Sequence, residues 1–205
     1  MATLTRERIL EAAVRLADRD GPDAVTLRKI AGELGVHVTS LYNHVPTRDA
    51  VTDGIVELLL DEAKLPTGPI AWDDWVREFI DAVGGIAATH PGAFHALQQV
   101  PVQGARATAS FEVALAAFRA AGFSPADAFA AVKNAAYLAL MIGQERSMVA
   151  RGDLHETRLD ALPAESFPLV RSVASDAADY ENVWAFGVET LVAGLRARLS
   201  EQDGR

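Results

Sequence analysis

The segment TLRKIAGELGVHVTSLYNHVPTR, residues 26–48, decides the fold of this chain. Its first part has apolar residues at the i, i+3, i+4, i+7 spacing of an amphipathic helix, namely Leu27, Ile30, Ala31 and Leu34. Thr26 precedes this helix as an N-cap residue, and Gly35 follows it, where a left-handed residue ends helices. The segment therefore begins with one short, well-delimited helix and a glycine turn.

A second short helix follows the turn and carries two different faces. Val36, Leu41 and Val45 are predicted to face the core, and Pro46 ends the helix. The other face gathers hydrogen-bonding side chains, those of His37, Thr39, Ser40, Tyr42, Asn43 and His44. Helix, glycine turn and polar helix together predict a helix-turn-helix, the unit that places a recognition helix in the major groove of DNA.

The charge of the chain argues mildly against a nucleic-acid partner. The net charge is -9, and residues 1–60 carry seven basic and nine acidic residues, whereas residues 61–205 carry twelve and nineteen. DNA-binding surfaces are usually basic. Four of these seven cations, Arg6, Arg28, Lys29 and Arg48, must therefore gather on one face. We expect modest affinity per half-site and a strong need for a dimer.

The rest of the chain predicts an all-α protein with two domains. Besides the motif, helices are expected at about 5–19, 48–63, 72–89, 92–98, 105–121, 125–150, 163–177 and 180–200. Alternating β-branched runs are absent, and residues 201–205 resemble a frayed tail. The Pro- and Gly-containing segment 65–69 separates a DNA-binding domain, residues 1–64, from a ligand-binding and dimerisation domain, residues 65–205.

Composition and motifs exclude several classes of function. The chain has no cysteine, no apolar run long enough to span a membrane and no signal-peptide pattern at its N-terminus, so we expect a soluble cytoplasmic protein without a membrane partner. The sequence contains no H-E-x-x-H, G-x-S-x-G, P-loop or dinucleotide-binding motif. We therefore expect no catalysis, no cofactor and no metal site.

The chain resembles the tetracycline-repressor (TetR) family. A first helix, then TLRKIAGELGV, a short helix ending in LYNHV and a capped fourth helix match its N-terminal unit in order and spacing, most closely the tetracycline repressors themselves. THPGAFHAL and AGFSPADAF resemble the ligand-binding domain of that subgroup more weakly. The resemblance implies a homodimer that represses transcription and releases a near-palindromic operator when a small molecule binds; some members of the family activate instead.

The match also implies which side chains contact DNA. Arg28 suits a bidentate contact to guanine, and His37, Val38 and Thr39 occupy the start of the recognition helix, where methyl groups suit thymine. Phosphate contacts are expected from Thr26, Ser40, Tyr42, His44 and Arg48, while Asn43 suits either a base or a phosphate. The alternative for each residue alone is a solvated helix face, and for Tyr42 it is partial packing against the first helix.

Candidates for a ligand pocket are aromatic, aliphatic and a few polar residues of the second domain. They are Phe79, Phe94, His95, Phe111, Phe118, Asn134, Tyr137, Leu138 and Met141. Each has core packing as its alternative. His95 falls near a histidine that tetracycline-binding relatives offer to magnesium, with Glu145 as the one obvious carboxylate; a structural histidine is the more common case. The lining favours a flat or hydrophobic effector.

The last long helix is the candidate for dimerisation. Its apolar stripe consists of Val183, Trp184, Gly187, Val188, Leu191 and Leu195, and packing within one chain is the alternative. The helix at 125–150 is the expected partner surface, which would give a four-helix contact across a two-fold axis. A second hypothesis for the whole chain is a TetR-like small-molecule-binding module that lacks sequence-specific DNA binding.

Overall fold

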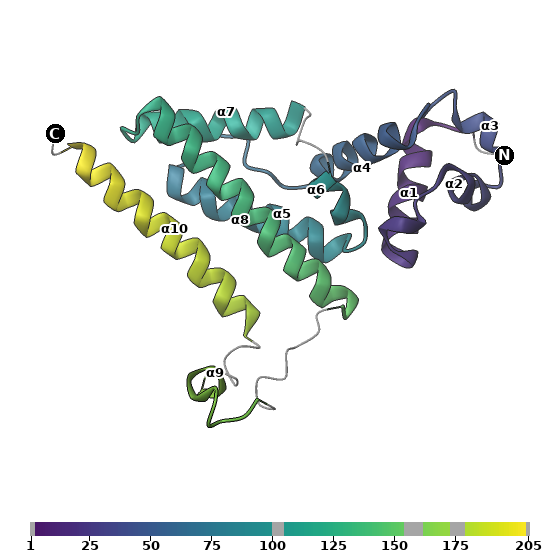
Figure 1. The fold of residues 1–205 in the computed structure, drawn as a ribbon. Coiled ribbons are helices and arrows are strands. Elements are labelled where there is room, and N and C mark those ends of the chain that lie inside the picture. Colours follow the sequence, from purple (N-terminus) through teal and green to yellow (C-terminus); the bar gives the residue numbers. More distant parts are fainter. Residues whose placement is uncertain (1–2, 100–104, 154–161, 173–178, 204–205) are drawn as a thin grey trace.

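The computed structural model describes residues 3–99, 105–153, 162–172 and 179–203, and within them the chain is helical with no strand (Figure 1). The all-α prediction is confirmed. Figure 1 shows an elongated molecule, with α3 near the N-terminus at one end and the C-terminus at the other. The helices are α1 (Arg6–Asp20), η1 (Pro22–Ala24), α2 (Leu27–Leu34), α3 (Val38–Leu41), α4 (Arg48–Glu62), α5 (Trp72–Thr89), η2 (Ala93–His95), α6 (Ala96–Gln99), α7 (Ala105–Ala120), α8 (Pro125–Arg151), α9 (Pro168–Ser172) and α10 (Tyr180–Asp203).

Local sequence signals explain where the N-terminal helices begin and end. The hydroxyl oxygens of Thr5, Thr26 and Thr47 each accept a hydrogen bond from a backbone N–H in the first turn of α1, α2 and α4, respectively. Apolar residues of α1, among them Ile9 and Leu16, are fully buried and form the centre of this three-helix unit, against which α4 packs. We call α1 to α3 the reading unit.

The second part is built around α5, which packs closely on α8. Trp75 is fully buried and stacks on Phe79, with ring centroids 4.6 Å apart, and its indole N–H donates to the hydroxyl of the buried Ser110 on α7. Helix α10 lies along α5 and α8 (Figure 1). We call α5 to α8 with α10 the regulatory core.

Three helix predictions need correction. The predicted helix 163–177 is restricted to Pro168–Ser172 in the described residues, because Pro163 and Pro168 disfavour the helical conformation of the residues before them; residues 173–177 lie outside the described part. The predicted tail continues α10 to Asp203. The segment 92–98 is a 3-10 turn followed by a separate short α6.

Candidate DNA interface and ligand cavity

Two tight connections fix the geometry of α2 and α3. Gly35 ends α2 in the left-handed conformation, with φ 65°, and its N–H reaches the carbonyls of Ala31 and Gly32. A side chain at this position would be strained, so glycine turns the chain sharply into α3. The fully buried Leu41 and Val45 then anchor α3 and the turn that follows it.

All the residues predicted to contact DNA lie on or beside α2 and α3, at one end of the molecule (Figure 1). Seven of them are exposed, namely Thr26, Arg28, His37, Thr39, Tyr42, Asn43 and Arg48. Val38, Ser40 and His44 are partly buried. The hydroxyl of Thr39 lies 3.4 Å from Nδ1 of His37, so these two polar groups sit together at the start of α3.

Beside this face, one arginine forms ion pairs and two arginines form none with the described residues. Arg19 of α1 pairs with Glu33 of α2 at 3.1 Å. It also donates to Asp20, which holds the pKa of that carboxyl below its usual value. Within the part of the chain that the structure describes, neither Arg28 nor Arg48 forms an ion pair. Their charges are therefore available to an external anion.

Arg6 was expected to join the basic face that contacts DNA, but it pairs with an acidic residue of α4. Its guanidinium pairs with Glu57 of α4 at 2.8 Å. The pair links the start of α1 to α4, and it arises because α4 packs along α1. Arg6 thus has a structural partner that the sequence did not indicate.

A small apolar cavity lies between α4, α5, α6, α7 and α8. Its volume is about 30 Å³, and it is lined by Leu60, Leu65, Phe79, Val83, Leu97, Ala107, Phe111, Ala136 and Leu140. Phe79 and Phe111 are the two predicted ligand residues that line it. The aliphatic and small residues were missed, because no single helix pattern shows which side chains from different helices meet.

Phe94 and Phe118 belong to the packed core and do not line the cavity. Phe94 is fully buried, and its ring lies so close to Gly143 of α8 that a Cβ there would be 2.3 Å from the ring. Phe118 packs between Trp72 and Phe123, with ring centroids 5.4 and 5.1 Å away. In this structure both side chains pack in the core, and their role in ligand binding stays a prediction.

The predicted ligand residues on α8 face away from the cavity. Tyr137 and Met141 are 57% and 62% exposed, and the Asn134 amide donates to the backbone carbonyl of Ala130. Leu138 is partly buried beside Gly187 of α10. The reason is helical phase: Ala135, Ala139 and Ile142 form the buried face of α8, so Tyr137 and Met141 point outward and Leu138 faces α10.

His95 also lies elsewhere than expected. It borders a groove of about 570 Å³ between the reading unit, the start of α4 and α6, and its Nε2 lies 3.1 Å from the Gln99 amide nitrogen. Glu145, its proposed partner, accepts a 2.6 Å hydrogen bond from the Trp184 indole. Different elements thus engage the two residues, and no group of three or more potential metal ligands comes together among the described residues.

The apolar stripe predicted for dimerisation packs mainly inside the chain. Trp184 is buried, so its side chain is not available to a partner. Gly187 is partly buried, and Val188, Leu191 and Leu195 are partly buried against the core, whereas Val183 is 53% exposed. Most of this stripe packs within the chain because α10 lies against α5 and α8.

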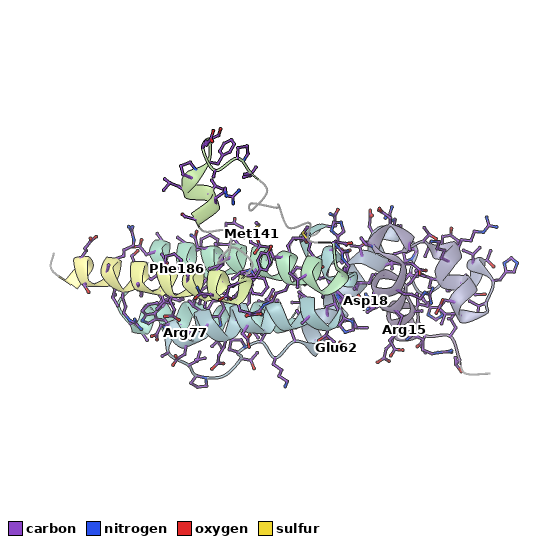
Figure 2. The ribbon with its side chains drawn as sticks, turned by 90° about the horizontal axis from the view of Figure 1, so that it is seen from below. Arg15, Asp18, Glu62, Arg77, Met141 and Phe186 are labelled. Atoms are coloured by element: carbon purple, nitrogen blue, oxygen red, sulfur yellow. The ribbon has the colours of Figure 1, made fainter. Side chains whose placement is uncertain are left out.

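Large apolar side chains instead face solvent on the other sides of α8 and α10. Phe129, Tyr137 and Met141 follow each other on α8 at spacings of eight and four residues, and Phe186 of α10 is 73% exposed (Figure 2). Phe129 and Phe186 were not among the predicted residues. With Val183, these residues form what we call the α8–α10 apolar surface. An exposed patch of this kind indicates an interface.

The helix-turn-helix at one end and the helical core behind it define a DNA-binding regulator. The family model "Bacterial regulatory proteins, tetR family" matches residues 9–53. An HTH-type transcriptional regulator of Saccharopolyspora erythraea is 35% identical over 204 residues, covering 95% of this chain and 85% of the relative. The tetracycline repressor protein class D of Escherichia coli is 28% identical, covering 98% and 93%.

A solved structure extends the likeness to the whole fold. The Streptomyces coelicolor TetR family protein ActR in complex with actinorhodin superposes with a TM-score of 0.82 at 25% identity, covering 97% of this chain and 99% of that one. The chain belongs to the TetR family of transcriptional regulators. In the described residues, no helix is both long and apolar enough to cross a membrane.

Proposed function

We propose that this regulator is a homodimer that represses transcription by binding a near-palindromic operator and releases it when a small molecule enters the core. Residues 1–64 act as the DNA-binding domain and residues 65–205 as the ligand-binding and dimerisation domain. The observation that carries the proposal is the exposed, hydrogen-bonding helix-turn-helix face, on which Arg28 and Arg48 form no ion pair with any described residue.

In this account, Arg28, His37, Val38 and Thr39 read base edges, and Thr26, Ser40, Tyr42, His44 and Arg48 hold phosphates. The planar fork of N–H donors on an arginine guanidinium suits the O6 and N7 acceptors of guanine, whereas hydroxyls suit phosphate oxygens equally well at any sequence. Asn43 is exposed and suits either role. Each reading unit brings few cations to its half-site, so a second copy of the reading unit is needed for useful affinity.

The second copy is proposed to dock on the α8–α10 apolar surface. Covering the exposed phenylalanine, tyrosine and methionine side chains with a partner removes apolar surface from water and so stabilises the complex. A two-fold interface brings the same surface of both copies together. Helices α8 and α10 of each copy would form a four-helix contact.

The size of the apolar cavity explains why a ligand would shift the conformation. Ligand pockets usually measure about 300–1,000 Å³, whereas the cavity measures about 30 Å³. A ligand therefore binds only when α4 to α8 separate, and it favours that expanded state. Different affinity for two states is the requirement for a ligand to move their equilibrium. The cavity lining favours a mostly apolar aromatic effector, and ActR, a relative in fold, binds actinorhodin.

The protein is proposed to act by binding without catalysis, in the cytoplasm, where the chromosomal operator is accessible.

The test uses the duplex that the wild type selects from random DNA, labelled for fluorescence anisotropy, with fused-ring aromatic compounds as probes and actinorhodin as the first. We expect at least one probe to lower operator binding in the wild type. Ala136→Val, which adds two methyl groups to the lining of this small cavity, should keep operator binding but respond less to the probe. If a probe releases the wild type and the cavity variant from the operator equally well, the ligand binds outside the cavity, which would contradict this part of the proposal.

A further inference from the structure

The segment that joins α5 to α6 is held from two sides. We call residues 90–94 the junction turn. On one side, the buried hydroxyl of Ser147 on α8 donates to the carbonyl of Pro91 at 2.5 Å, and Gly143 of α8 contacts the ring of Phe94. On the other side lies α1 of the reading unit. The turn is therefore the point where the regulatory core touches α1 directly.

Asp18 of α1 provides the polar half of that contact. Its Oδ1 accepts hydrogen bonds from the backbone N–H groups of Gly92 and Ala93, both at 2.9 Å. These amides begin η2, which has no side-chain cap from its own N-cap residue. Amides at a helix start have no partner inside the helix, so the Asp18 carboxylate caps η2 from a different domain.

His90 extends the contact to a third element. Its Nδ1 lies 2.9 Å from the second carboxylate oxygen of Asp18, and its Nε2 lies 3.1 Å from Glu62 near the end of α4. Figure 2 shows Asp18 and Glu62 at the junction between the reading unit and the core. Glu62 is half-exposed, whereas Asp18 is mostly covered, so the bond to α1 is the better shielded of the two.

Close packing of backbones fixes the geometry of this contact. A Cβ at position 92 would lie 2.0 Å from the carbonyl oxygen of Ala17 and 2.7 Å from the Cα of Asp18. Gly92 has an ordinary negative φ, so glycine is required here for space and not for conformation. A movement of the junction turn must therefore either carry α1 with it or break the Asp18 cap.

We propose that Asp18 is a positioning residue that couples the regulatory core to the reading unit through α1, in addition to any movement of α4. The proposal rests on the function proposed above. Because coupling between two sites is reciprocal, the operator itself reports it: DNA binding at the reading unit must change the stability of the junction turn. No effector is needed for the test.

The test measures amide hydrogen exchange of Gly92 and Ala93 in the full-length protein, free and saturated with the selected operator duplex. In the wild type, we expect the operator to change this exchange by about fivefold or more. In Asp18→Ala, exchange of the free protein should be about tenfold faster, as for loss of a helix cap, and the operator should no longer change it. Asp18→Glu, with one extra methylene, should behave similarly if Asp18→Ala fails to fold.

Matched variants separate coupling from general destabilisation. Asp18→Asn keeps an acceptor oxygen at the same place and should restore most of the operator effect. Glu11→Ala removes an exposed carboxylate from the same helix and should leave exchange at the junction turn unchanged. Exchange of the buried part of α8 should stay equal in all variants.

The outcomes are distinguishable. If the wild type binds its operator without any change at Gly92 and Ala93, or if Asp18→Ala and Asp18→Glu retain the operator effect, the coupling proposal is overturned while the proposed function stands. If the wild type binds no duplex, the proposed function itself fails and the coupling proposal falls with it; faster exchange in free Asp18→Ala would then report the cap alone.

Discussion

At the scale of single residues, Arg28 gives the sharpest prediction about DNA. Arg28→Ala should weaken binding to the selected operator by about 1–3 kcal/mol and relax preference at one base position, because a bidentate contact to guanine is lost. Titrations with the operator and with single-base variants measure both effects. Arg15→Ala is the control, since Arg15 lies exposed on α1 and pairs only loosely with Glu11, at 3.8 Å.

Equal weakening of binding to every duplex would contradict this assignment and make Arg28 a phosphate contact. Arg15→Ala should weaken neither binding nor selectivity beyond a small electrostatic effect. A comparable loss in the control would show that total charge, and not a particular contact, determines the affinity.

A second residue-scale prediction concerns packing in the core. A methyl group at position 143 would lie 2.3 Å from the ring of the fully buried Phe94. Gly143→Ala should lower the free energy of unfolding by about 1–3 kcal/mol, as overpacking does. Denaturant titration measures the change, and the double variant with Phe94→Leu should lose less than the sum of the two single variants. Full additivity would mean that the two positions do not contact each other.

The sequence predicted the DNA face at this scale better than it predicted the ligand residues. Thr26, Gly35 and the polar face of α3 carry their signal within one short segment, so their positions could be deduced from spacing. Phe94 and Phe118 have the same residue type as Phe79 and Phe111, and only the crossing of helices decides which ring lines the cavity. Residue type alone therefore does not separate core from pocket.

At the scale of elements, ion pairs attach α10 to α5. Arg77 donates to Glu189 at 2.7 Å and lies 3.4 Å from Asp73, which also accepts from Arg196. The hydrogen bond from Arg77 holds the pKa of Glu189 below its usual value. Burial opposes ionisation of Asp73, but hydrogen bonds from Arg196 and Arg77 outweigh it, so the pKa of Asp73 is also lowered.

This network predicts a stability that depends on pH. A carboxyl with a lowered pKa stabilises the fold above the pKa of the unfolded chain, about 4.3 for glutamate, and this contribution is lost as pH falls through the lower folded-state pKa. Glu189→Gln should therefore lower the Tm slightly at pH 7, and the difference from the wild type should disappear in acid below that range. Circular dichroism melts measure it. A gap that does not narrow at all as the pH falls through the acid range would mean that Glu189 acts through packing.

Helix boundaries could be predicted from the sequence where capping residues mark them. Which face of a helix is buried could not always be predicted. Ser124 and Pro125 correctly predicted the start of α8, and the Ser124 hydroxyl accepts from the Asp127 N–H. Helix α10 carries apolar residues on two faces. The sequence pattern identified the apolar face that carries Trp184, and this face packs inside the chain. Phe186 lies on the other apolar face, which is exposed.

At the scale of the whole molecule, the α8–α10 apolar surface predicts the assembly. Phe186→Glu should convert the dimer into a monomer, because a charge at the centre of an apolar interface remains unpaired there. Sedimentation velocity measures the mass. The monomer should also lose operator affinity, since one reading unit then contacts only one half-site.

Ala116→Glu adds the same charge to an exposed position of α7 and serves as the control. It should remain a dimer with unchanged operator affinity. A Phe186→Glu protein that still sediments as a dimer would mean that another surface holds the two copies together.

We propose that this chain reads a specific DNA sequence as a two-fold dimer, and the direct test is selection of bound duplexes from a randomised library at a stated salt concentration. We expect enrichment of one near-palindrome whose half-site centres lie about one turn of B-DNA apart, roughly 34–36 Å, or at the next spacing that places both reading units in the major groove. No enrichment, even at low salt, would contradict it and would favour a small-molecule-binding module without sequence-specific DNA binding.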